Sequence, residues 1–207
     1  MAVNALDAAT DVLERARNLL ALDRPSIPEF VRADLRRAAL AQGVAALDTY
    51  LHWAIRKVAF AEPLPNKLSE LPVGFGNLVT MASSSVAARQ RKHPDRPQTR
   101  ARNVLNDKLL KMTFQTPQQV EIALQMLGVA KCWKQLADAF IPPATASDVR
   151  HELNRISQRR NKIVHEGDLV RQARPQQIKH EPVTAAEVSA DLDWIQSFIK
   201  ALGHLVG

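Results

Sequence analysis

The sequence predicts a single all-α domain over residues 1–207, a helical bundle with a long central helix and one basic flexible loop. Alanine and leucine dominate the composition and aromatic residues make up only 5% of it, which favours helices over strands. Apolar residues recur at helical spacing along most of the chain. Capping signals and prolines mark where successive helices begin and end. We see no internal repeat and no convincing strand.

The first two predicted helices cover residues 3–22 and 28–60. Prolines separate them, and Ser26 and Glu29 form a predicted capping box for the second. Two apolar stripes follow this long helix, so we expect it to be packed on more than one side. One stripe contains Val31, Leu35, Ala38, Ala45, Thr49 and Trp53, and the other contains Leu40, Val44, Leu47, Leu51, Ile55 and Val58.

The middle of the chain alternates predicted loops with shorter helices. Residues 62–76 are rich in proline and glycine, which predicts a loop, and a helix is expected from 77 to 89. The stretch 89–102 is polar, basic and interrupted by prolines, so we predict a flexible loop there. Further helices are expected over 103–112, 117–127 and 129–140. Thr116 and Gln119 provide a capping box for the helix over 117–127.

Two helices joined by a polar loop complete the predicted bundle. The first covers residues 147–166, and the loop covers 167–182. Thr184 and Glu187 are expected to cap the last helix, whose apolar residues recur at helical spacing up to Leu202.

Charge and cysteine content narrow the classes of function. The net charge of +7 permits binding to a polyanion such as RNA. Cys132 is the only cysteine, so no intramolecular disulfide is expected and a reduced cytoplasmic setting fits best. No signal peptide and no apolar run of membrane-spanning length are recognisable, so we expect no membrane partner. The sequence shows neither metal-ligand spacing nor a glycine-rich phosphate loop, and no metal or cofactor is expected.

The segment 159–168, Arg-Arg-Asn-Lys-Ile-Val-His-Glu-Gly-Asp, carries the candidate chemistry. RNA cleavage needs a proton acceptor for the 2′-hydroxyl, a proton donor for the leaving oxygen and positive charge on the phosphorus centre. His165 suits both proton transfers near neutral pH, and Arg160 offers paired donors for phosphate oxygens. Arg160 and His165 are five residues apart, about 140° around a helix, whereas Asn161 and His165 share a face.

Each candidate also has an ordinary structural interpretation. His165 fits a histidine that caps a helix C-terminus, and Arg160 fits one member of a solvated basic face. Asn161 fits an exposed helical position. Asp48 is four residues before His52, which fits an ordinary helical ion pair. Tyr50 and Trp53 favour the core over RNA stacking.

Three further cations near the motif are candidates for RNA binding through phosphate contacts. These residues are Arg155, Arg159 and Lys162. Each is also consistent with a charge that is simply solvated on a helix surface.

Four segments of the chain resemble the RiboL-PSP-type branch of the HEPN superfamily, which carries an R-x4-6-H motif. The segments are Arg37-Ala38-Ala39-Leu40, the stretch 46–52, Thr113-Phe114-Gln115 and the stretch 159–168. The resemblance covers residues 30–205 and implies a helical bundle that dimerises through its motif helices. It implies a cleft lined by Arg160 and His165 of both protomers. It also implies a polar or acidic residue of the long helix near this cleft, which makes Asp48 a catalytic candidate that orients His165 or Arg160.

The resemblance further implies a metal-independent endoribonuclease that leaves a 2′,3′-cyclic phosphate and a 5′-hydroxyl. Its expected role is that of a toxin or antiviral defence effector, with RNA, a second copy of the chain and an antitoxin or defence-system protein as partners. The alternatives are a non-catalytic HEPN scaffold that binds RNA or a partner protein, and a helical interaction module in which Arg160 and His165 stabilise a dimer.

Overall fold

The computed structural model describes residues 3–59, 62–90, 96–171 and 177–206, with backbone only at 84, 86–90 and 96–98. These residues form nine α-helices and no strand, which confirms the all-α prediction. One isolated antiparallel bridge joins Leu169 to His180 between the last two helices.

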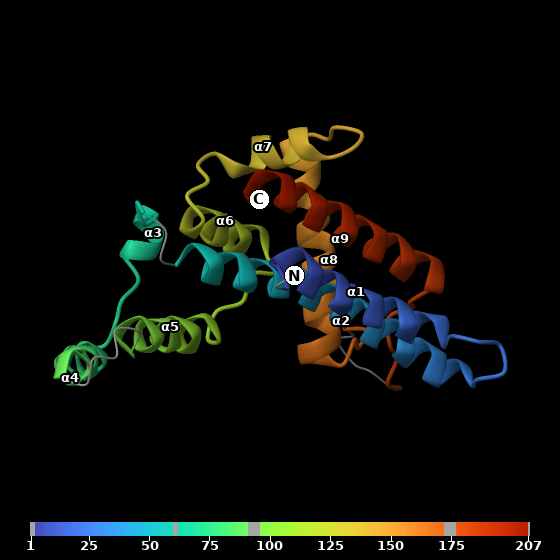
Figure 1. The fold of residues 1–207 in the computed structure, drawn as a ribbon. Helices are drawn as coiled ribbons and strands as arrows, with labels where there is room; N and C mark the ends of the chain where they lie inside the picture. The colour runs from blue at the N-terminus through green and yellow to red at the C-terminus, as the bar shows by residue number, and fades with distance from the viewer. Residues whose placement is uncertain (1–2, 60–61, 91–95, 172–176, 207) are drawn as a thin grey trace.

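Helix α2 (Glu29–Val58) is the centre of the bundle. It runs antiparallel to α1 (Ala5–Ala21), and α9 (Ala185–Val206) lies alongside both, while α8 (Ala146–Glu166) crosses the layer (Figure 1). Helices α5 and α6 also contact α2. The long helix is therefore central, as the sequence predicts.

Only one of the two predicted stripes of α2 is buried. The buried residues of this helix are Arg36, Ala39, Leu40, Gly43, Val44, Ala46, Leu47, Tyr50, Leu51, Ala54 and Ile55. Ala38 is exposed and Trp53 retains 37% of its surface, so the expectation that Trp53 belongs to the core was wrong. The neighbours of α2 together cover one broad side of it, which leaves the other stripe partly in solvent.

The predicted capping box at the start of α2 was also wrong. Pro28 occupies the N-cap position, and no side chain caps the helix there. The Glu29 carboxylate instead lies 3.0 Å from Arg32 and 2.7 Å from Arg36. A tertiary cluster of charges thus replaces the local cap.

The region between α2 and α6 contains more helix than the sequence predicts. The expected loop 62–76 includes the single turn α3 (Asn66–Ser69), and α4 spans Phe75–Gln90. The expected flexible loop 89–102 was wrong for residues 96–102, because α5 spans Arg96–Leu109. Pro97 lies in the first turn of α5, where a missing N–H group costs little. Residues 91–95 of the expected loop lie outside the described residues.

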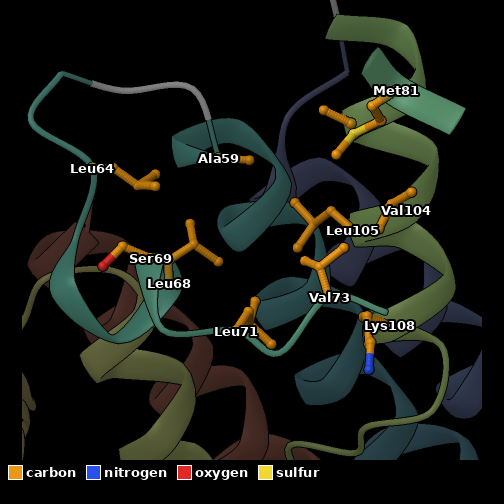
Figure 2. Close-up of a pocket in the computed structure, with 11 residues that line it drawn as sticks. Ala59, Leu64, Leu68, Ser69, Leu71, Val73, Met81, Val104, Leu105 and Lys108 are labelled. Atoms are coloured by element: carbon orange, nitrogen blue, oxygen red, sulfur yellow. The ribbon is translucent and has the colours of Figure 1, made fainter. Parts of the chain in front are cut away.

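Helices α4 and α5 lie side by side at one edge of the molecule, away from α1 and α9 (Figure 1). An apolar pocket of about 190 Å³ separates α5 from the end of α2 and from α3 (Figure 2). Leu64, Leu68, Leu71, Val73 and Leu105 contribute to its wall. The pocket contains none of the residues of the 159–168 motif.

The remaining caps are as predicted. Helix α6 (Pro117–Met126) begins with the capping box of Thr116 and Gln119, and α9 begins with the reciprocal bonds of Thr184 and Glu187. Cys132 opens α7 (Cys132–Ala139) and is buried. Of the helices described, none combines the length and hydropathy needed to cross a membrane.

Candidate functional site

The motif occupies the last turns of α8 and the turn that follows. Gly167 adopts a left-handed conformation with φ of 62°, which favours glycine because it lacks a Cβ atom. The carbonyl of Lys162 accepts hydrogen bonds from the N–H groups of Gly167 and Asp168, so a terminal helix carbonyl is satisfied. This turn ends α8 directly after His165 and Glu166.

The side chain of Asp168 is fully buried and holds the end of α8 against α2. Its Oδ2 atom lies 2.8 Å from Nε of Arg37, and its Oδ1 atom lies 2.9 Å from Nη1 of Arg159. The same two guanidinium groups donate to the carbonyls of Glu181 and Pro182. We call Asp168, Arg37 and Arg159 the Asp168 anchor, because it joins α2, α8 and the segment before α9.

The three predicted RNA-binding cations of α8 are all paired with carboxylates of the same chain. Arg155 binds Glu152 and Asp191, and the hydrogen bonds that it donates to Glu152 are the main reason that the pKa of Arg155 lies above its ordinary value. Arg159 belongs to the Asp168 anchor. Lys162 lies 3.7 Å from Glu181. Each of the three therefore already has a carboxylate partner within the chain.

Arg160 differs from these cationic neighbours. Its Nη1 donates to Oδ1 of Asn161 at 3.1 Å, and no carboxylate lies within ion-pair distance among the residues that the structure describes. Its Nε is buried and has no hydrogen-bond partner there. The neutral amide of Asn161 thus steadies the guanidinium without neutralising its charge.

His165 is exposed in the last turn of α8. Within the described part of the chain, its ring forms no hydrogen bond with Arg160, Asn161 or Asp48. Val164 beside it retains 49% of its surface, and Leu169 is also exposed. Val164 follows Arg160 by four residues, so both project from the same side of the helix.

Asp48, which was expected to orient His165 or Arg160, instead binds the segment that precedes α6. Its Oδ1 accepts a hydrogen bond from the N–H of Phe114 at 2.6 Å, and its Oδ2 accepts one from Nε2 of Gln115 at 3.2 Å. His52 lies 3.5 Å away, as expected for a helical pair. Asp48 therefore fixes the segment before α6 to α2.

That segment also connects α2 to the motif helix. The hydroxyl of Ser157 donates to the carbonyl of Gln115, so the residue bound by Asp48 contacts α8 one turn before Arg160. Asp48 makes no described contact with Arg160, Asn161 or His165. Of the four catalytic candidates, only the sequence neighbours Arg160 and Asn161 are hydrogen-bonded to each other in the described residues, and Asp48 is linked to α8 through Gln115 and Ser157.

The described residues contain no cluster of three or more metal-binding side chains. Comparison of the chain with protein-family models, with curated proteins and with solved structures gave no match.

Proposed function

We propose that the chain is a metal-independent RNA endonuclease that acts as a homodimer through Arg160 and His165. The observation that carries this proposal is the state of Arg160 within a basic helix. Its neighbours Arg155, Arg159 and Lys162 have carboxylate partners, whereas the guanidinium of Arg160 is hydrogen-bonded only to a neutral amide among the described residues. A guanidinium held in this way remains able to bind an external anion such as a phosphodiester.

The proposed reaction uses the nucleophile that RNA already contains. One His165 accepts the proton of the 2′-hydroxyl, whose oxygen attacks phosphorus and expels the 5′-oxygen of the next nucleotide. A second His165 donates a proton to that leaving oxygen, which gives a 2′,3′-cyclic phosphate and a 5′-hydroxyl. Arg160 stabilises the negative charge that builds on the phosphate oxygens.

Two copies of the chain are needed because each chain offers one His165. A two-fold interface brings two His165 and two Arg160 side chains around one phosphate. The exposed apolar side chains of Val164 and Leu169 flank His165 and supply surface that such an interface would bury. The dimer is thus proposed to form through the ends of the two α8 helices.

Cleavage of a labelled single-stranded RNA in the presence of EDTA tests this proposal. We expect His165→Ala to lower the rate by at least about 100-fold, the smaller end of the contribution typical of general acid–base catalysis. His151→Ala is the matched control, because His151 is an exposed histidine of the same helix. Equal cleavage by wild type and His165→Ala would overturn the proposal. Binding of RNA without any cleavage would favour the non-catalytic scaffold instead.

In the cell, such an activity suits a toxin or defence effector that is restrained by an antitoxin-like partner. Expression of the wild-type chain alone in a bacterial host is then expected to arrest growth, and expression of His165→Ala is not. Growth arrest by both would separate the toxicity from RNA cleavage.

A further inference from the structure

A second cavity, of about 460 Å³, lies where α1 begins and where α2 and α9 end. Its polar lining consists of Asn4, Tyr50, Lys57, Lys200 and His204, and the rest of its lining is apolar or glycine. No aspartate or glutamate lines it among the described residues. Lys57 is about 30 Å along α2 from Arg37, at 1.5 Å per residue, so this end cavity is separate from the motif.

The cations of the end cavity have no internal counter-charge in the described part of the chain. Lys57, Lys200 and His204 are exposed, and none of them forms an ion pair with a described carboxylate. The ends of α2 and α9 each contribute about −0.5 charge, and the start of α1 contributes about +0.5. Two lysines, together with the carboxylate of Asp7 that caps the start of α1, therefore leave this end with a positive balance of about +0.5 before His204 is counted.

The start of α1 also offers backbone donors to the cavity. Asn4 and Asp7 form a capping box, in which the side chain of Asn4 accepts from the N–H of Asp7. The N–H groups of Ala5 and Leu6, which line the cavity, form no hydrogen bond among the described residues. Such terminal N–H groups bind anions readily.

Tyr50 adds a hydroxyl group to the lining of the cavity. Its side chain is only 4% exposed, yet its hydroxyl has no hydrogen-bond partner among the described residues. The hydroxyl lies 3.9 Å from the point where a Cβ atom on Gly203 would stand, and Gly203 also lines the cavity. The hydroxyl therefore lines the cavity as a donor that no described protein acceptor occupies. Burial raises the pKa of Tyr50, which keeps the hydroxyl available as a donor.

We propose that the end cavity binds a small organic phosphate. The phosphate group contacts Lys57 and Lys200 and accepts a hydrogen bond from Tyr50. The organic group rests on the apolar wall that Leu6, Val58 and Val206 provide. The volume falls within the range of about 300–1,000 Å³ that is usual for small-molecule sites.

Titration followed by two-dimensional NMR of the amide signals tests this proposal with three probes. The probes are inorganic phosphate, phenyl phosphate and phenol. We expect phenyl phosphate to bind more tightly than inorganic phosphate and to shift the amides of Ala5, Leu6 and Gly203. Phenol, which lacks the charge, is expected to bind at least tenfold more weakly than phenyl phosphate. Equal shifts with phenol, or no shift of these amides with either phosphate, would overturn the proposal.

Substitutions separate the contributions of charge and hydroxyl. Lys57→Gln combined with Lys200→Gln is expected to weaken phenyl phosphate binding at least tenfold, and Tyr50→Phe about threefold to tenfold, the cost of one hydrogen bond. Lys111→Gln combined with Lys134→Gln removes the same charge from positions outside the cavity and should leave binding unchanged. If both double variants weakened phenyl phosphate binding equally, the net charge of the protein would explain the affinity, and a specific site in the cavity would be contradicted. None of these outcomes depends on RNA cleavage.

Discussion

At the scale of single residues, the sequence of the motif indicates which side chains are catalytic candidates but not which residues they bind. Arg160 and His165 stand out in the sequence because few residue types combine phosphate binding with proton transfer near neutral pH. Asp168, by contrast, gives no sign in the sequence that it is buried. Its partner Arg37 is 131 residues away, so only the fold shows that Arg159 is committed to Asp168 and that Arg160 is not.

Replacement of Asp168 tests the anchor directly. Asp168→Asn removes the buried carboxylate that pairs with Arg37 and Arg159 and leaves Arg37 only the exposed Asp34, so we expect the free energy of unfolding to fall by about 3 kcal/mol. Urea unfolding measures this change. Asp11→Asn, which breaks an exposed i,i+4 pair with Arg15, should cost less than about 1 kcal/mol. Similar costs for both variants would show that the anchor does not stabilise the fold.

A pH-dependent contribution to stability is expected from Asp23. Hydrogen bonds from Arg36 and Arg32 lower the pKa of Asp23 from its ordinary value of 3.8. A lowered folded-state pKa stabilises the fold above the unfolded value, and this stabilisation disappears as the pH falls below 3.8 through the folded value. The free energy of unfolding of wild type should therefore fall more steeply between about pH 4 and pH 2 than that of Asp23→Asn. Identical slopes would contradict the pairing.

At the scale of elements, the sequence predicts a helix start correctly where the capping residues bond to each other. The Thr116–Gln119 and Thr184–Glu187 boxes form because each depends on residues three positions apart. The signal at Ser26 and Glu29 fails because Arg32 and Arg36 bind the glutamate instead. The prediction for 89–102 was partly wrong because prolines and basic residues are typical of loops. A proline is nevertheless tolerated in the first turn of a helix, which is where Pro97 lies in α5.

The turn after α8 provides a prediction for an element end. Gly167→Ala forces a Cβ atom into a left-handed backbone conformation, so we expect a loss of about 1 kcal/mol in the free energy of unfolding. Gly76→Ala is a suitable comparison, because Gly76 lies in α4 and has open space around it. Thermal unfolding of both variants checks this. A loss from Gly76→Ala as large as that from Gly167→Ala would speak against a conformational cause.

At the scale of the whole molecule, the sequence predicts the bundle because helical periodicity is repeated along most of the chain. It could not predict which stripe of α2 stays exposed or where cavities form, because these depend on how helices far apart in sequence pack. The end cavity is an example, since Tyr50, Lys57 and Lys200 look unrelated until α1, α2 and α9 meet. The proposed dimer belongs to the same scale.

Val164 offers a test of that dimer. Val164→Glu places a charge on the proposed interface beside His165, so we expect sedimentation to show a monomer and the cleavage rate to fall at least tenfold. Val79→Glu, at a valine of α4 with a similar exposure of 47%, should remain dimeric and active. A wild-type chain that cleaves RNA as a monomer would be inconsistent with two cooperating copies of His165.

The chemistry of the product ends bears most directly on the proposed reaction. Wild-type protein should cut an RNA oligonucleotide in EDTA, and mass spectrometry of the fragments should reveal a 2′,3′-cyclic phosphate and a 5′-hydroxyl. An otherwise identical oligonucleotide with a 2′-deoxy sugar at the cut site should stay intact there. Fragments with a 3′-hydroxyl and a 5′-phosphate, or cleavage at the deoxy position, would contradict attack by the 2′-hydroxyl and the roles assigned to Arg160 and His165.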